Sequence, residues 1–377
     1  QTCALPISSR RRFISGGIGK SLFKSHDFRV RNFINLVAVK FPRGTDIEVI
    51  QNIFSNTLSR FSKMGARNFG ASEFIPYVQE ILNPAWTSWD VFNAKGKTLN
   101  KLCVGADTHI KLDTPRKSFY LSARSEKPWA AKTVTIKEPS EYLNAFDFQR
   151  MFFDQLQQEC NILSSPFFMQ LTVVIDDRYK LKEMIQDKVN NNIENLSKVG
   201  KYALSNPVLK DRFDEARDVA VALKDGEFPL PAMWSLTVFD ERPSRLNQIV
   251  DSILSRFDRK NFKLQVEDHA TIAFQSMIFS LPLQYNKITA EHLKRFDLLF
   301  KTNGAQVCPI LSDFRGRGDI VTPIFGRTAQ IQAIDLFSNK AGNSVVVGGT
   351  GTGKSFFVSD LITHSLAAGC KVVMADL

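Results

Sequence analysis

The sequence has few cysteines, and those that it has stand far apart. Its 377 residues include five, at Cys3, Cys103, Cys160, Cys308 and Cys370. Small disulfide scaffolds carry a denser and even-numbered set, and zinc knuckles and redox motifs need closely spaced pairs. The cysteine pattern therefore excludes a disulfide-stapled secreted module and favours a reducing compartment.

Long apolar runs are also missing. The longest uncharged stretch, residues 270–285, contains Gln275, Pro282 and Gln284, and it is shorter than the roughly 18 to 20 apolar residues that span a bilayer. We therefore predict no transmembrane helix. Residues 1–8 lack the basic start and apolar centre of a signal peptide. They resemble an artefactual leader, and we expect the native protein to begin upstream of residue 9.

A third absence concerns catalytic and metal-binding sets. The histidines have no metal-ligand spacing; they are His26, His109, His269, His292 and His364. The sequence contains no Ser/His/Asp or Cys/His arrangement that can be argued, and no zinc finger or RNA-recognition motif. Hydrolase triads, zinc sites and these nucleic-acid modules are therefore not indicated.

What is present is the composition of a folded, basic protein. Apolar residues make up 44% of the chain and charged residues 23%, which is ordinary globular usage. The 49 Lys and Arg outnumber the 38 Asp and Glu, for a net charge of +11. Such a balance favours anionic partners such as nucleic acid, nucleotides or phospholipid head groups.

The first hundred residues predict a strand and two helices. Residues 28–41 are rich in aromatic and β-branched side chains, which indicates a strand. The capping box Thr45–Glu48 predicts the start of an amphipathic helix that ends at Gly65. A second helix is predicted over residues 73–82, where Asn83-Pro84 stops it.

The middle of the chain alternates between strand and helix patterns, which indicates an α/β or α+β domain with helices covering a sheet. Strands are predicted at 118–122, 133–136, 168–175, 234–239 and 262–266, and helices at 142–160, 178–225 with an interruption near Asn206-Pro207, and 244–257. The Gly-rich basic stretch Arg315–Gly318 is the predicted boundary. We therefore expect an accessory or docking domain over residues 9–315 and a second domain that begins at residue 316.

One segment carries specific chemistry. Residues 348–355, Gly-Gly-Thr-Gly-Thr-Gly-Lys-Ser, fit the pattern of a P-loop, which follows a strand and opens a helix. A strand is predicted at Val345–Val347 and a helix at Phe356–Ala368. The residues predicted to bind ATP are Gly348, Gly349, Thr350, Gly351, Thr352, Gly353, Lys354 and Ser355.

Each part of this loop has a physical role. Its glycines let backbone N–H groups converge on nucleotide phosphates, beside the positive end of the helix. Lys354 is predicted to reach the β- and γ-phosphates, and the Ser355 hydroxyl is predicted to bind Mg²⁺. These two residues are the predicted catalytic pair, and Ser355 is the predicted metal ligand.

Four other features are weaker. Gly16–Ser21 ends in Gly-Lys-Ser, but no glycine stands at position 14, so we interpret it as a flexible basic segment. The run Arg10–Arg12 is interpreted as solvated surface. Asp376 is interpreted as a polar strand end rather than a catalytic acid, although ligands gather at such strand ends. His364, on the predicted loop helix, is interpreted as a surface or packing residue.

The region before and through the loop resembles the TraC-type ATPases of F-like conjugative type IV secretion systems. The residues that carry the resemblance are Gly326-Arg327, Asp335-Leu-Phe337, Gly342-Asn343-Ser344 and Gly349–Phe357, with weaker echoes at 21–23, 31–33, 74–84 and 280–282. Thr328-Ala329 and Ser344 depart from the family pattern. The resemblance implies a RecA-like P-loop domain that uses ATP and Mg²⁺. It also suggests adenine or inter-subunit contacts from Gly326-Arg327.

The resemblance also implies a cellular role. The implied protein is a cytoplasmic homo-hexamer at the bacterial inner membrane, which contacts other secretion components. Its implied role is to power pilus assembly and substrate or DNA transfer. Because the chain stops within the apolar run 370–377, we expect a truncated RecA-like domain and negligible ATP hydrolysis. Two alternatives stay open: a hexameric DNA translocase of the related superfamily, and an interaction module without catalysis that docks through residues 9–315.

Overall fold

The computed structural model divides the chain into two compact units. The sheet unit comprises Val37–Ala145 and Ser165–Pro309, and the loop unit comprises Gln1–Leu36, Phe146–Ser164 and Ile310–Leu377. Within them the structure describes residues 34–62, 65–83, 102–104, 108–123, 127–138, 148, 163, 165–175, 183, 185–187, 189–191, 194, 207–227, 229–310, 316, 322–326, 330–337 and 343–375.

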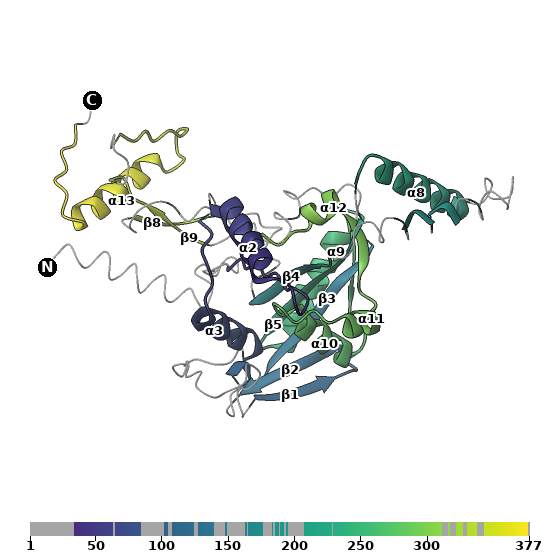
Figure 1. Ribbon diagram of the computed structural model, residues 1–377. Coiled ribbons are helices and arrows are strands. Elements are labelled where there is room, and N and C mark those ends of the chain that lie inside the picture. Colours follow the sequence, from purple (N-terminus) through teal and green to yellow (C-terminus); the bar gives the residue numbers. More distant parts are fainter. Residues whose placement is uncertain are drawn as a thin grey trace. The chain divides into compact units, whose positions relative to one another are not determined.

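The sheet unit is built on an antiparallel sheet of seven strands (Figure 1). The strands are β1 (Thr108–Asp113), β2 (Ser118–Ala123), β3 (Trp129–Glu138), β4 (Phe167–Val173), β5 (Pro229–Asp240), β6 (Lys263–Val266) and β7 (Asp297–Phe300). The order is β1-β2-β3-β5-β4, with β6 also pairing β3 and β7 also pairing β5. All of these pairings are antiparallel, so the predicted mixed α+β fold is confirmed for this unit.

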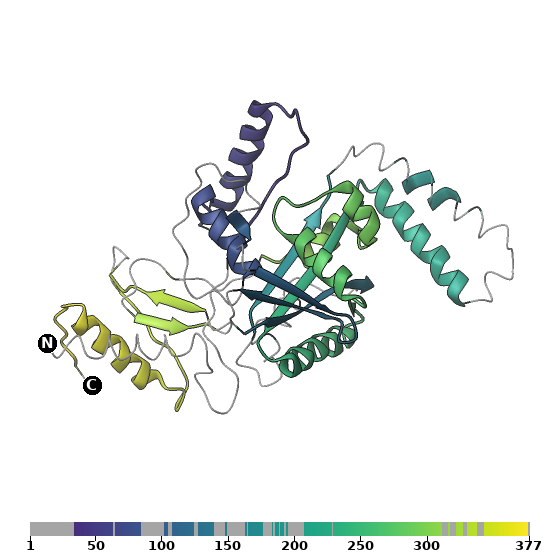
Figure 2. The same ribbon diagram turned by 90° about the horizontal axis from the view of Figure 1, so that it is seen from below.

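Helices cover both faces of the two central strands (Figure 2). Alternate residues of a strand point to opposite faces. Thr133 of β3 points towards α10 (Ala270–Ser280), because its hydroxyl donates to the Ala273 carbonyl at 2.9 Å. Lys132 points to the other face, where the charge of Asp251 of α9 (Pro243–Asp258) acts on its amine. Burial between the helix and the strand lowers the pKa of Lys132.

The helix α9 follows the predicted amphipathic pattern. Pro243 occupies its first turn, where a missing N–H costs nothing. One side of the helix is buried: Leu246, Ile249, Val250, Ile253 and Phe257. The Phe257 ring packs against Phe262 with centroids 5.3 Å apart. This seam forms the core on that face of the sheet.

The core on the other face joins α10 to α3 (Ala71–Leu82). The shared buried cluster includes Ile75, Val78, Leu82, Phe119, Leu121, Met277 and Leu281. Phe119 and Phe274 meet edge to face, with centroids 5.5 Å apart. The predicted helix over residues 73–82 is thus confirmed, and its stop at Asn83 is as expected.

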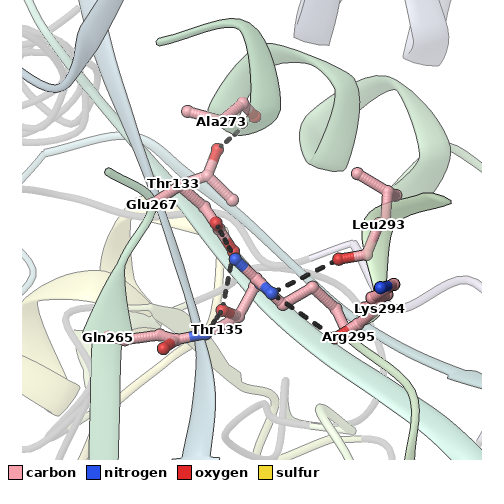
Figure 3. A network of polar contacts seen from close by, with 8 residues as sticks. All are labelled: Thr133, Thr135, Gln265, Glu267, Ala273, Leu293, Lys294 and Arg295. Atoms are coloured by element: carbon pink, nitrogen blue, oxygen red, sulfur yellow. Dashed lines mark hydrogen bonds and ion pairs between the residues drawn. The ribbon is translucent and has the colours of Figure 1, made fainter. Parts of the chain in front are cut away.

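A buried ion pair anchors the end of β6 (Figure 3). Arg295 approaches Glu267 with two hydrogen bonds of 2.8 Å each, and the Glu267 side chain is fully buried. The hydroxyl of Thr135 donates a third bond, also of 2.8 Å, to the same carboxylate. The bonded Glu267 raises the pKa of Arg295 against the opposing effect of burial. This network ties the turn after α11 (Lys287–Leu293) to the central strand β3.

Two predictions near the start of the sheet unit were wrong in detail. Residues 34–41 form no strand, because a strand needs a hydrogen-bonding neighbour and no described strand forms a ladder with them. The helix α2 (Ile47–Phe61) is present, but its N-cap is Asp46, which accepts from the Glu48 N–H at 3.1 Å. Thr45 does not cap it, because its hydroxyl donates to the Pro42 carbonyl instead.

Most of the other predictions for the sheet unit are confirmed, and several elements were not predicted. Those for β2, β3, β4, β5, α9 and β6 are confirmed. The helix α8 (Pro207–Lys224) begins where the interruption was predicted. The helix predicted over 142–160 lies almost wholly outside the described residues. The pattern analysis missed β1, α10, α11, β7 and α12 (Lys301–Gln306).

The loop unit contains a hairpin and one long helix. The hairpin pairs β8 (Thr322–Phe325) with β9 (Ile331–Ile334), and the helix is α13 (Lys354–Ala367), which contacts β8. Gly316 forms a bridge to Ala333 of β9. It has a φ of +92°, and a Cβ there would lie 1.7 Å from the Ala333 carbonyl oxygen. Only glycine fits this approach, and neither the hairpin nor the bridge was predicted.

Candidate functional site: the loop before α13

The candidate site is the loop of residues 348–353 and the first turn of α13. Gly353 is the N-cap of the helix, with φ of +85°, and Gly351 also has a positive φ of +78°. Residues with side chains rarely adopt this backbone conformation. The two glycines therefore allow the chain to curl before it enters the helix.

Thr352 closes the loop on itself. Its hydroxyl donates to the Gly349 carbonyl at 2.8 Å, and its N–H bonds the same carbonyl at 3.4 Å. A Cβ at Gly348 would lie 2.7 Å from the Thr352 hydroxyl oxygen. The loop is thus a compact turn that depends on a small residue at position 348, and the motif alone gave no sign of this contact.

The helix presents its N-terminal end together with both predicted ligands. Lys354 and Ser355 are exposed, and they are the first two residues of α13. The first N–H groups of a helix have no acceptor within it, and the helix dipole makes this end positive. The first turn carries no acidic residue, and no side chain caps Gly353. An anion at this end meets backbone N–H donors and the Lys354 amine, and the Ser355 hydroxyl lies beside them. A nucleotide phosphate needs such donors, and its Mg²⁺ needs an oxygen ligand such as the hydroxyl.

The far end of α13 is a packing surface. Leu361, His364 and Ser365 are buried. The Nδ1 atom of His364 lies 2.8 Å from the Asp360 carbonyl oxygen and the Ser365 hydroxyl donates to Leu361 at the same distance. The predicted helix over 356–368 is confirmed within two residues, and His364 lies at a packed rather than a solvent-facing position.

The segments on either side of the loop helix are extended but are not strands. Residues 343–349 and 370–375 form no strand, so the predicted strand at Val345–Val347 and the strand-like run from Cys370 are corrected. Several of their side chains are highly exposed, with Val345 at 86% and Val373 at 97%. Strand hydrogen bonds require a neighbour, and no described residue supplies one to either segment.

Several predicted features stay outside the described part of the chain. These are Gly16–Ser21, Arg10–Arg12, Arg327 and Asp376. Gly326 is described, and its N–H donates to the Gln330 carbonyl across the β8–β9 turn. Within the described residues, His, Cys, Asp and Glu do not gather in threes to suit a metal ion.

Comparison with known protein families matches the part of the chain before the loop. A family model described as TraC protein matches residues 4–285. The chain belongs to the TraC family. Its membership supports a role in F-type conjugative transfer. The match ends before the loop of residues 348–355, so the loop and the family are independent observations on one chain.

Two further findings bear on the family assignment. A search of curated proteins found no match to this chain. Among the residues that the structure describes, no helix is both long and apolar enough to cross a membrane.

Proposed function

We propose that this TraC-family chain binds ATP with Mg²⁺ at residues 348–355, as part of a motor that powers pilus assembly and substrate or DNA transfer. The proposal rests on the backbone before α13. Gly351 and Gly353 both have a positive φ, and the helix that follows begins with Lys354 and Ser355. This arrangement groups backbone N–H donors, an amine and a hydroxyl at one helix end, which supports phosphate binding in a chain of a conjugative-transfer family.

The proposed roles follow from position. The Lys354 amine neutralises the β- and γ-phosphates, and the backbone N–H groups of Gly351 and of residues 353–355 hold the phosphate oxygens. The Ser355 hydroxyl would hold Mg²⁺, which would supply positive charge that neutralises the phosphates. Thr352 keeps the turn formed before the nucleotide arrives, since its hydroxyl already holds the Gly349 carbonyl.

We also propose a RecA-like arrangement around α13. Strands of parallel sheets are buried on both faces and are rich in valine, and the two extended segments beside α13 are Val345-Val-Val347 and Val372-Val-Met374. They are therefore suited to a parallel sheet with α13 as its crossover. A homo-hexamer that contacts inner-membrane secretion components from the cytoplasm fits this motor role.

Nucleotide titration tests the proposal. We expect the 377-residue chain to bind a fluorescent ATP analogue with Mg²⁺, and Lys354→Ala to weaken binding about tenfold or more, because the phosphate loses its charged partner. Ser355→Ala should remove most of the difference between Mg²⁺ and EDTA. Lys371→Ala is the matched control, since that lysine is also exposed but lies beyond the helix.

Two outcomes count against the proposal. Binding that is equal in the wild type and in Lys354→Ala excludes the loop as the nucleotide site. ATP hydrolysis by the whole protein that requires DNA, together with steeply salt-dependent DNA binding, favours the DNA translocase instead.

A further inference from the structure

The helix α2 has a broad apolar side that the sheet unit leaves exposed. At 3.6 residues per turn, an apolar arc covers about half of the helix; its members are Ile47, Val49, Ile50, Ile53, Phe54, Leu58 and Phe61. None of the helix residues is buried. Ile47, Val49, Ile53 and Phe54 are 39% to 68% exposed. An isolated helix of this length is only marginally stable in water, so a covering surface would stabilise it.

The segment before α2 continues this apolar surface. Val37 and Val39 are 53% and 48% exposed in an extended chain that pairs with no described strand. Between that chain and α2, Lys40 donates to the Tyr285 carbonyl and so fixes the segment to the sheet unit. Residues 37–61, named here the α2 surface, therefore form one exposed apolar region held on a folded base.

Positive charge is concentrated in the stretch of sequence that leads into this surface. Residues 10–43 contain nine Lys or Arg and a single acidic residue, Asp27, which gives +8 of the total net charge of +11. Two of these basic residues, Lys40 and Arg43, lie within the α2 surface. When α2 is viewed along its axis, Arg60 lies between Val49 and Ile53. A long basic side chain at this position can reach beyond the apolar side chains. The opposite side is polar, with Glu48 as its charged residue beside Gln51, Asn52, Ser55 and Asn56.

We propose that the α2 surface docks on an anionic phospholipid bilayer, with α2 lying in the plane of the head groups. Apolar side chains enter the boundary of the acyl region, while Arg43 and Arg60 contact lipid phosphates. Nucleic acid offers no place for Ile53 and Phe54, and a second copy would bring two basic surfaces together. The charge and the apolar arc together therefore favour a lipid surface. This proposal goes beyond nucleotide binding and does not depend on it.

Vesicle flotation tests the proposal with the 377-residue chain. We expect the wild type to float with vesicles of phosphatidylethanolamine and phosphatidylglycerol, and far less with phosphatidylcholine alone. Val49→Ser/Phe54→Ser should lower the partition coefficient about tenfold or more on the anionic vesicles. Arg43→Glu/Arg60→Glu should lower it similarly at low salt, and less at high salt, because salt screens the attraction.

The control variant is Ile288→Ser/Leu298→Ser, which removes two exposed apolar side chains elsewhere on the sheet unit and should float like the wild type. Circular dichroism and light scattering accompany every variant. Three outcomes overturn the proposal: a wild type that does not float, a Val49→Ser/Phe54→Ser variant that floats normally, or a dimer that this variant dissociates. Retention of DNA without retention of vesicles also overturns it.

Discussion

Two runs of β-branched residues have opposite surroundings in the two units. Thr133–Ile136 lies in β3, with strands on both edges, and is almost entirely buried. Val345–Val347 lies before the loop, with Val345 and Val347 almost fully exposed and no strand neighbour among the described residues. The two sequences have similar strand propensity. The difference shows that pairing and packing, rather than composition, make a strand.

The largest expected effect contrasts two phenylalanines. Phe257 is fully buried against Phe262 in the sheet unit, whereas Phe356 is 81% exposed in the loop unit. We expect Phe257→Ala to lower the free energy of unfolding by about 4 kcal/mol, because it leaves a cavity. Phe356→Ala should change it by less than about 0.5 kcal/mol.

Urea denaturation followed by tryptophan fluorescence measures both variants. Equal losses would mean that Phe356 is packed in solution and that the contrast between the units is wrong.

The second effect contrasts a buried with an exposed ion pair of the sheet unit. Arg295→Met leaves the buried Glu267 carboxylate with the Thr135 hydroxyl and without its cation. We expect a loss of about 3 kcal/mol, because an uncompensated buried charge is costly. Lys263→Met breaks the exposed pair with Glu138 and should leave the urea midpoint unchanged.

The urea midpoints of unfolding of the two variants test whether the buried pair contributes more to stability than the exposed pair. An Arg295→Met protein as stable as the wild type would show that the network in Figure 3 does not anchor β6.

Sequence patterns predicted the helices and strands of the sheet unit best where the same side chains pack in the core. The periodicity of α9 and the β-branched runs of β3 and β5 gave the right elements, because those side chains are buried in the core. The strand β1 was missed although Ile110 and Leu112 alternate with polar residues, since such a short and largely exposed run is a weak signal, and the four residues of β7 show no alternation. The strand at 28–41 failed in its described part because propensity cannot supply a neighbour.

The candidate site was predicted in sequence but not in detail. The spacing of glycines before Lys354 predicted a turn with positive φ that leads into a helix, and the helix begins two residues before the predicted start at Phe356. The closing bond from Thr352 to Gly349 and the Gly316 approach to Ala333 depend on three-dimensional contacts that no motif encodes.

The smallest expected effect tests the packed face beneath α9. Burial lowers the pKa of Lys132, opposed by the charge of Asp251. At neutral pH the charged lysine therefore opposes folding, and Lys132→Met should stabilise the sheet unit by less than about 1 kcal/mol. As the pH rises towards the ordinary value of 10.5, the folded wild type releases its proton first and its free energy of unfolding increases.

Urea midpoints at neutral and alkaline pH check this sign. The advantage of Lys132→Met should shrink as the pH rises, and a variant that is less stable at neutral pH would show that Lys132 contributes favourably through Asp251.

Nucleotide binding at the loop of residues 348–355 can be measured directly by hydrogen exchange with mass spectrometry, with and without MgATP. We expect slower exchange of the amides of residues 348–357 on addition of MgATP, unchanged exchange in β3 and β5, and no slowing in Lys354→Ala. Unchanged exchange in the loop, or slowing confined to the sheet unit, would contradict binding at the loop.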